Sequence, residues 1–201
     1  KTKKILLIKK IQKAKKIIKK KIIKKNELFN TDNFQKIISK LKGNNFIIDN
    51  KSCSIYYENI IKSKFKILKR EDPTYLLKAI KNKTEIQHMI NSHIIDGVAL
   101  TKFIHWIKNV NKKKITEVQA QNKLESYRRL NKNYLYPSFE TIAGSGKNGA
   151  IVHYRAENKN CRTLKKKDIF LCDSGGQYKY GTTDVTRTIC FSKPKPHIKD
   201  I

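Results

Sequence analysis

Two aspartates toward the carboxyl end of the chain are the residues whose spacing best suits chemistry. Asp173 ends one apolar β-like run and Asp184 lies in the next, with the glycine-rich segment 175–181 between them. This pattern predicts a β-hairpin. With the turn centred between Tyr178 and Lys179, the two aspartates stand opposite each other, and cross-strand neighbours have Cβ atoms about 4.5–5.5 Å apart.

Two carboxylates this close repel each other unless a proton or a cation lies between them. Carboxylate oxygens are ligands that hard divalent ions prefer. A pair of such ions about 3.5–4 Å apart generates a hydroxide nucleophile and polarises a carbonyl group. The spacing therefore predicts a metal site. A structural interpretation stays open beside it, in which one aspartate ends a strand, the other caps the hairpin and solvent screens both.

His153 is the third residue with a chemical interpretation. It follows the apolar pair Ile151-Val152, and strand alternation predicts its side chain on the face opposite Val152. A lone histidine in such a run is most often held by a structural hydrogen bond. It gains a functional interpretation if the aspartate hairpin packs beside it.

The glycine-rich loop 143–149 resembles a phosphate-binding loop only superficially. A P-loop needs Gly five residues before its Gly-Lys pair and Ser or Thr after the Lys, whereas this chain has Thr141 and Asn148 at those positions. The glycines instead predict a tight turn between strands.

A scaffold of short strands and two helices must position these residues. Thr84 and Thr116 each begin a capping box, Thr-x-x-Gln, which predicts a long helix after Thr84 and a second helix ending near Leu130. Short β segments are expected at 138–143, 150–154, 168–173 and 182–189.

The segment before Asp72-Pro73 has a different sequence pattern. An amphipathic segment at 34–41, a Gly-Asn-Asn turn and short apolar strands at 46–48 and 65–68 form an α/β pattern. The pattern is too short to close a full domain, and Asp72-Pro73 marks a boundary.

Residues 1–25 contain thirteen lysines and no acid. Their apolar residues recur with helical spacing, which predicts a cationic amphipathic helix. Three alternatives stay open for this helix. It lies on an anionic membrane surface, it binds RNA, or it is a terminus whose sequence has drifted and that has no function. The apolar positions are Leu7, Ile11, Ala14, Ile18 and Ile22.

The composition excludes several classes of protein. With 201 residues, of which 38% are hydrophobic, the chain is neither a collagen nor a disordered low-complexity segment. Its longest apolar runs have four residues, far short of the roughly 20 that span a membrane. Four cysteines without a CxxC pair or framework spacing predict reduced thiols and a cytoplasmic location.

The charge is unusual for a globular chain. Lys and Arg number 46 against 16 Asp and Glu, a formal net charge of +30, and six arginines leave 40 lysines. Such a balance suggests a polyanion partner. Recognition of phosphate or guanine favours Arg, whereas this chain is rich in Lys, Ile and Asn, which have AT-rich codons. Drift in an AT-rich genome is therefore the leading interpretation of the charge, and nucleic-acid binding is the minor one.

Two strings of sequence resemble Xaa-Pro aminopeptidase, the aminopeptidase P branch of the pita-bread metallopeptidases. They are Thr141-Ile-Ala-Gly-Ser-Gly-Lys-Asn-Gly-Ala-Ile-Val-His-Tyr-Arg155 and Asp173-Ser-Gly-Gly-Gln-Tyr-Lys-Tyr-Gly-Thr-Thr-Asp-Val-Thr-Arg-Thr188. Residues 72–85 and 93–100 are similar to the linker and first long helix of that catalytic domain. The resemblance runs from about residue 27 to residue 191 and indicates the long, three-domain form.

The resemblance implies an α+β fold. Residues 72–201 would form the N-terminal half of a pita-bread metallopeptidase domain. Residues 26–71 would form the end of a middle α/β domain of the creatinase N-terminal type, and residues 1–25 a Lys-rich basic segment. A homodimer is also implied.

The resemblance also implies roles for the candidate residues. Asp173 would be a ligand of one metal ion and Asp184 would bridge two, typically Mn²⁺. His153 would contact the substrate and stabilise or shuttle charge at the scissile peptide. The substrate would be a peptide with proline at its second position, from which the first residue is released.

The family completes its metal site with one His and two Glu that follow these aspartates. After Asp184 this chain offers only His197 and Asp200, and no Glu. Two aspartates supply at most four oxygens, too few for two coordination shells. We therefore expect residues 1–201, as a truncated product, a partial chain or a decayed gene, to bind metal weakly and hydrolyse little. We also expect unpaired strand edges and an uncovered apolar face.

Two competing functions stay open. A non-catalytic pita-bread module that binds peptides or proteins is disfavoured, because both aspartates are kept. Nucleic-acid binding through the lysine-rich surface is the other alternative, and its affinity would fall steeply with salt.

Overall fold

A computed structural model of the chain describes residues 5–9, 18–20 and 23–199. The chain divides into two compact units, residues 1–80 and 81–201, and each is described by itself. Among the described residues, every helix is too short or too polar to cross a bilayer.

The first unit is built around a parallel β-α-β arrangement. Strands β3 and β4 pair in parallel, and helix α3 connects them. Ile38, Ile48, Ile61 and Phe65 form the buried core between the helices and this sheet. The α/β pattern expected before Asp72 is thus confirmed. Its elements are β1 (Leu6–Ile8), β2 (Leu28–Asn30), α2 (Phe34–Lys40), β3 (Asn45–Ile48), α3 (Ile55–Lys62), β4 (Lys66–Lys69) and α4 (Thr74–Ala79).

The amphipathic helix predicted for residues 1–25 does not begin where expected. Leu7 lies in β1, which pairs in parallel with β2 from Leu6↔Leu28 to Ile8↔Asn30. The four-residue apolar run favours an extended strand here, because a paired strand satisfies its backbone without helical spacing. Ile11, Ala14 and Ile22 lie outside the described residues.

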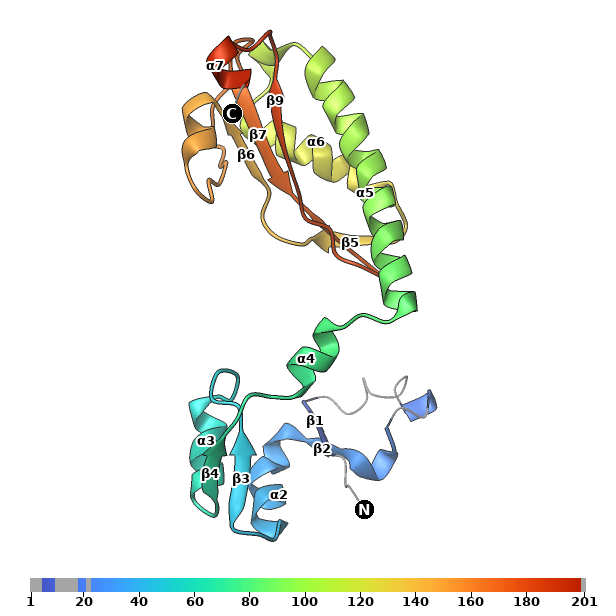
Figure 1. The fold of residues 1–201 in the computed structure, drawn as a ribbon, viewed down its shortest axis with the longest axis vertical. Helices are drawn as coiled ribbons and strands as arrows, with labels where there is room; N and C mark the ends of the chain where they lie inside the picture. Colours follow the sequence, from blue (N-terminus) through green and yellow to red (C-terminus); the bar gives the residue numbers. More distant parts are fainter. Residues whose placement is uncertain (1–4, 10–17, 21–22, 200–201) are drawn as a thin grey trace. The chain divides into compact units, whose positions relative to one another are not determined.

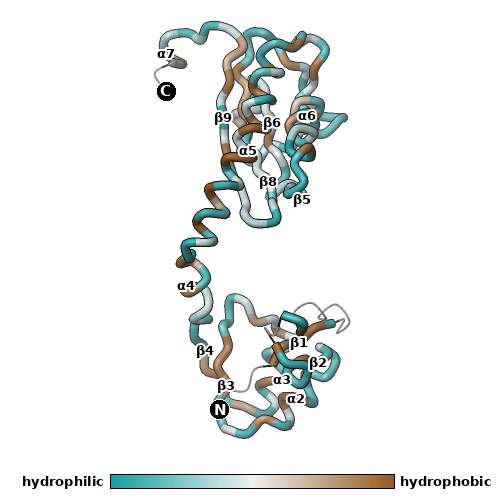
Figure 2. Tube along the Cα trace, turned by 90° about the vertical axis from the view of Figure 1, so that its right-hand side faces the viewer, coloured by the Kyte–Doolittle hydropathy of each residue, from teal (hydrophilic) through white to brown (hydrophobic). Residues whose placement is uncertain are grey.

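The second unit packs two helices against a three-stranded antiparallel sheet (Figure 1). Strand β7 is central, with β6 and β9 on its two sides, and β5 pairs separately with β8. Figure 2 shows hydrophobic residues recurring along α5 and the strands. The elements are α5 (Lys83–Asn109), α6 (Glu117–Arg129), β5 (Tyr134–Pro137), β6 (Ile142–Ser145), β7 (Ile169–Ser174), β8 (Gly176–Tyr178), β9 (Val185–Cys190) and α7 (Pro196–Lys199).

Both long helices begin with capping boxes, one of them earlier than predicted. At α6 the predicted box is confirmed: the Thr116 side chain accepts from the Gln119 N–H at 3.2 Å, and Gln119 accepts from the Thr116 N–H at 2.9 Å. At α5 the box is formed by Asn82 and Glu85, not by Thr84. Asn is at least as good a cap as Thr, so the helix starts nearer the amino end.

The core of the second unit lies between the helices and one face of the sheet. Phe103 and Ile107 of α5 and Leu124 of α6 pack with Phe170 and Cys172 of β7. Side chains alternate along β7, so Phe170, Cys172 and Ser174 are buried while Ile169, Leu171 and Asp173 are partly exposed. The helices therefore cover one face of the sheet, and Asp173 belongs to the other.

Candidate metal centre

Asp173 lies near the end of the central strand, flanked by Ile142 of β6 and Thr186 of β9. Its side chain is partly exposed, and its Oδ1 accepts a hydrogen bond from the Thr186 hydroxyl at 2.8 Å. One carboxylate oxygen is thus engaged by a neutral donor. The carboxylate lies on the face of the sheet away from the helices and is partly accessible there to a cation or a substrate.

Asp184 comes directly before β9 and is exposed. The predicted hairpin is present, but its register differs by two residues, because Asp173 pairs with Thr186 rather than with Asp184. The turn is centred between Lys179 and Tyr180, where the Tyr178 N–H donates to the Gly181 carbonyl at 2.8 Å.

The register shift has a physical cause and a limited consequence. Tyr178 is the last residue of β8, which pairs with β5, so the chain cannot turn until after it. A shift of two positions preserves the alternation of side chains. In a regular ladder, residues related as Asp173 and Asp184 are diagonal neighbours about 7–8 Å apart rather than a direct pair. The register shift therefore turns the predicted direct pair into a diagonal one.

His153 is not in a strand, contrary to the prediction for 150–154. Residues Gly146–Ala150 form a short 3-10 helix, and His153 follows in an exposed turn with φ of 54°. Gly149 packs directly on Gly144 of β6, and a Cβ added to Gly144 would lie 2.8 Å from the Gly149 nitrogen. Among the described residues, no hydrogen bond or ion pair joins His153 to either aspartate.

The loop that carries His153 is nevertheless anchored on a buried carboxylate. Glu117, at the start of α6, is fully buried. Tyr154 donates its hydroxyl to Glu117 at 2.7 Å, and the side-chain amide of Asn148 donates to the same carboxylate at 3.0 Å. The backbone N–H groups of Ser145 and Arg162 complete the set at 2.6 and 2.8 Å. Burial, and then the bond to Glu117, raise the pKa of Tyr154 to about 12, so its hydroxyl stays a donor at neutral pH.

A second buried network supports the aspartate hairpin. Arg128 of α6 donates to both oxygens of Asp96 on α5, at 2.6 and 3.0 Å. Arg128 also donates to the Ser174 hydroxyl at 3.1 Å, and the Tyr178 hydroxyl donates to Asp96 at 2.7 Å. Burial opposes the charge of Arg128, yet the Asp96 carboxylate raises the pKa of the guanidinium on balance. Ser174 and Tyr178, which lie at the two ends of the segment between Asp173 and the hairpin turn, are therefore both held by side chains of α5 and α6.

Sequence reasoning missed both networks. Asp96 and Arg128 are 32 residues apart, and Asp96 and Tyr178 are 82 apart, so no local motif connects them. Glu117 lies within the capping box at the start of α6, where an acidic residue is ordinarily explained by the helix dipole. A mid-helix Asp on an otherwise apolar face was the available signal, because a buried charge needs a partner.

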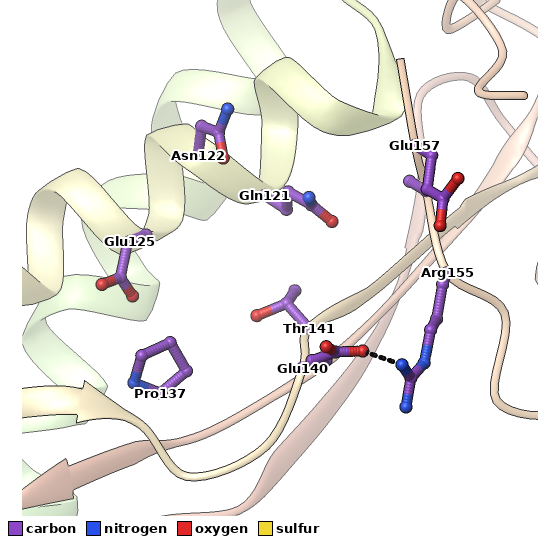
Figure 3. Close-up of a pocket in the computed structure, with 9 residues that line it drawn as sticks. Gln121, Asn122, Glu125, Pro137, Glu140, Thr141, Arg155 and Glu157 are labelled. Carbon is purple, nitrogen blue, oxygen red and sulfur yellow. Dashed lines mark ion pairs between the residues drawn. The ribbon is translucent and has the colours of Figure 1, made fainter. Parts of the chain in front are cut away.

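A cavity of about 350 Å³ lies between α6 and the segment that leaves the His153 loop (Figure 3). Arg155 and Glu140 both line this cavity and form an ion pair, which is dashed in Figure 3. This pair ties the chain two residues after His153 to the chain two residues before β6. The cavity itself includes neither His153 nor the two aspartates.

The donor set can be compared with what a metal needs. Asp173 and Asp184 offer carboxylate oxygens, which fit a hard divalent ion. Among the residues that the structure describes, no group of three or more His, Cys, Asp or Glu is placed to hold a metal. The pair therefore fits such an ion as part of a ligand set and does not complete one.

A family model and several known proteins match this chain. The model of metallopeptidase family M24 matches residues 87–201. A probable Xaa-Pro aminopeptidase P from Paracoccidioides brasiliensis (strain Pb03) is 52% identical over 120 residues, covering 58% of this chain and 20% of that protein. The Xaa-Pro aminopeptidase ApepP of Drosophila melanogaster is 44% identical over 149 residues, covering 73% of this chain and 24% of that protein. The chain thus spans about a fifth to a quarter of these relatives.

Solved structures show the same fold. An X-prolyl aminopeptidase from Caenorhabditis elegans, described as a cytosolic enzyme with a di-nuclear active site, matches with a TM-score of 0.75 and 26% identity, covering 92% of this chain and 31% of that one. A Xaa-Pro dipeptidase from Bacillus anthracis matches with a TM-score of 0.78 over 98% of this chain and 54% of that one, and at 19% identity it supports the fold alone.

The expected α+β fold of the pita-bread type is confirmed by these neighbours. The family model covers more than half of the 201 residues, including Asp173, Asp184 and His153. On this match, the chain belongs to metallopeptidase family M24.

Proposed function

We propose that the intact protein is a metal-dependent aminopeptidase that releases the residue preceding proline from the N-terminus of peptides. The relatives with the matches given above are named as Xaa-Pro aminopeptidases, which supports this substrate class. The di-nuclear site named for the Caenorhabditis elegans neighbour supports a two-metal centre, for which Mn²⁺ is our proposed metal. That neighbour is also described as cytosolic, which supports a cytoplasmic location.

The observation that carries the proposal is the β7–β9 hairpin with its two carboxylates. Asp173 lies on β7 and Asp184 directly before β9, and Asp173 faces away from the helical layer. We assign both as metal ligands, with Asp184 as the bridging one. The bound metal ions would polarise the carbonyl before proline and lower the pKa of a bound water. The Thr186 hydroxyl restrains one Asp173 oxygen, so that the other stays free for a ligand.

His153 is our candidate for the residue that contacts the substrate. It is exposed, and the described residues leave its ring without a hydrogen bond. The adjacent Tyr154 is fixed to Glu117, so the backbone beside His153 is held while the imidazole is free to bind a substrate.

The domain division is part of the proposal. We assign residues 72–201 to the first half of the catalytic domain, residues 26–71 to the end of a middle α/β domain and residues 1–25 to a Lys-rich segment. We also propose that the intact protein is a homodimer. Because residues 1–201 contribute two carboxylates to the site, we expect them on their own to bind metal weakly and hydrolyse little.

The test is the Asp184→Asn variant of the intact protein. We expect it to lose Mn²⁺-dependent release of the first residue from a peptide with proline at position two by at least about 100-fold, and to bind less Mn²⁺ in calorimetry. Glu157→Gln is the matched control, because it removes an exposed carboxylate of the same unit that lies outside the hairpin.

Circular dichroism separates loss of the site from loss of the fold. A folded Asp184→Asn variant with normal turnover would overturn the assignment. A wild-type protein that binds such peptides without cleaving them would favour the non-catalytic binding module instead.

A further inference from the structure

A second cavity lies at the opposite end of β7 from Asp173. It has a volume of about 730 Å³ and is formed by the end of α5 with the turn after it, by residues 163–166 and by Phe191. Phe191 follows Cys190, the partner of Ile169 at the beginning of β7. Asp173 is the next-to-last residue of β7, so the cavity and Asp173 lie near opposite ends of this strand. This volume is in the range of small-molecule sites.

The floor of the cavity is apolar and fixed. Leu164 is 1% exposed, and its backbone N–H donates to the Ile115 carbonyl at 2.8 Å. Phe191 stacks on the core residue Phe170 with ring centroids 6.0 Å apart. Val110, the C-cap of α5, is the third apolar lining residue. This floor can accept a nonpolar part of a ligand without rearrangement.

Four lysines surround this floor, and none of the described residues that line the cavity is acidic. They are Lys108, Lys112, Lys165 and Lys166. The ammonium of Lys112 lies 5.3 Å from the centre of the Phe191 ring and donates to the Lys108 carbonyl. Burial, and then the charge of Lys166, lower the pKa of Lys112. The Lys112 ammonium is thus held beside the Phe191 ring and near the second cation, Lys166.

The nearest acid in sequence does not neutralise this group. Asp168 already accepts from the Ser145 hydroxyl at 2.7 Å and from the Lys165 backbone N–H at 3.1 Å, and it lies 3.8 Å from Arg162. By contrast, the cavity beside Arg155 in the same unit is lined by Glu125, Glu140 and Glu157. The four lysines thus have no counter-charge among the described residues that line the cavity.

We propose that this cavity binds a small anion that carries two or more phosphate groups. Lysine ammonium groups act as point charges for phosphate, and four of them suit a multiply charged ligand. A concave site of this size suits a compact anion better than a nucleic-acid strand, which would need an extended groove. The proposal does not depend on the peptidase assignment, because the cavity and the aspartates lie at different ends of β7.

The test is calorimetric titration of the intact protein with inorganic tripolyphosphate and with ATP, at 50 and 200 mM NaCl. We expect binding of both, weaker at the higher salt. Equal affinity would show that the lysines alone recognise the phosphates, and tighter binding of ATP would show that the apolar floor contributes. Lys112→Met should weaken binding at least tenfold and unfold no earlier than the wild type, because it removes a partly buried cation and keeps the aliphatic stem.

Lys132→Gln is the matched control, because it removes the same charge from an exposed position of the same unit outside the cavity. The proposal is overturned if Lys112→Met binds tripolyphosphate as tightly as the wild type, or if Lys132→Gln weakens it equally. A 20-nucleotide RNA provides a further test. The proposal is also overturned if this RNA competes with tripolyphosphate and if Lys112→Met and Lys132→Gln reduce the affinity for the RNA to the same extent.

Discussion

Arg128 and Asp96 are nearly completely buried, and the guanidinium contacts the carboxylate in bidentate geometry. Because Arg128 also binds Ser174, the pair fixes the residue next to Asp173. Replacing Arg128 by Met would leave the Asp96 carboxylate buried with the Tyr178 hydroxyl as its remaining side-chain donor. We expect a loss of about 3–5 kcal/mol in the free energy of unfolding, measured by urea denaturation.

The neighbouring Arg129 provides the control. It forms an ion pair with Glu125 at 2.9 Å one helical turn away, and its side chain is exposed. Arg129→Met should cost less than about 1 kcal/mol. Losses of similar size in the two variants would mean that the charge on α6, and not the buried pair, sets the stability.

His153 adopts a left-handed backbone conformation, with φ of 54°, which disfavours any residue with a Cβ. Replacing His153 by Gly or by Ala removes the imidazole in both cases, but only Gly relieves the backbone. We expect the Gly variant to be more stable than the Ala variant by about 1 kcal/mol in thermal unfolding. Equal stabilities would show that this turn adopts another conformation in solution.

The tight closure of the aspartate hairpin depends on Gly175, two residues after Asp173. A Cβ at this position would lie 2.0 Å from the Thr183 carbonyl oxygen and 2.2 Å from the Ser138 hydroxyl. Ser138 and Thr183 are themselves hydrogen-bonded at 2.9 Å, so neither can move freely. We expect Gly175→Ala to cost at least about 1–3 kcal/mol in urea denaturation and to weaken Mn²⁺ binding by the intact protein.

Gly97 of α5 is the matched glycine, because a Cβ there meets no atom within 4 Å. Gly97→Ala should stabilise the protein by about 0.5–1 kcal/mol, since Ala is the better helix former. If Gly175→Ala were as well tolerated as Gly97→Ala, the hairpin would have room to shift, and the aspartates would not be held by its turn.

At the level of elements, the sequence predicts best where a pattern is local. The strand at 168–173 and the capping box at Thr116 are confirmed within a residue, because alternation and capping depend on near neighbours. The hairpin between Asp173 and Asp184 is also confirmed, but not its register. The register is set by the pairing of β8 with β5, and the paired residues are 39 to 44 positions apart in the sequence, from Pro137↔Gly176 to Tyr134↔Tyr178.

Other features depend on contacts that no local pattern contains. The turn at His153 follows from the contact of Gly149 with Gly144 and from the bond of Tyr154 to Glu117. The Asp96–Arg128 pair joins two helices. The candidate residues could therefore be chosen from their types and spacing, while the groups that hold their segments in place are visible only in the structure.

The charge of the whole molecule has its own consequence for stability. With 46 basic and 16 acidic residues, at least 30 cations have no acidic partner even if every acid pairs with one base. Folding brings these cations closer together, so their repulsion opposes the compact state. The Debye length falls from about 30 Å at 0.01 M salt to about 10 Å at 0.1 M, so added salt should relieve most of this repulsion.

We therefore expect the free energy of unfolding to rise by roughly 1 kcal/mol or more between 0.01 and 0.1 M NaCl, measured by urea denaturation. KCl should act equally, because screening depends on ionic strength and not on the ion. A free energy of unfolding that stays constant or falls over this range of salt would mean that the lysines lie too far apart to repel one another measurably. A rise with micromolar tripolyphosphate at constant ionic strength, lost in Lys112→Met, would instead report occupation of the lysine cavity, since screening at that concentration is negligible.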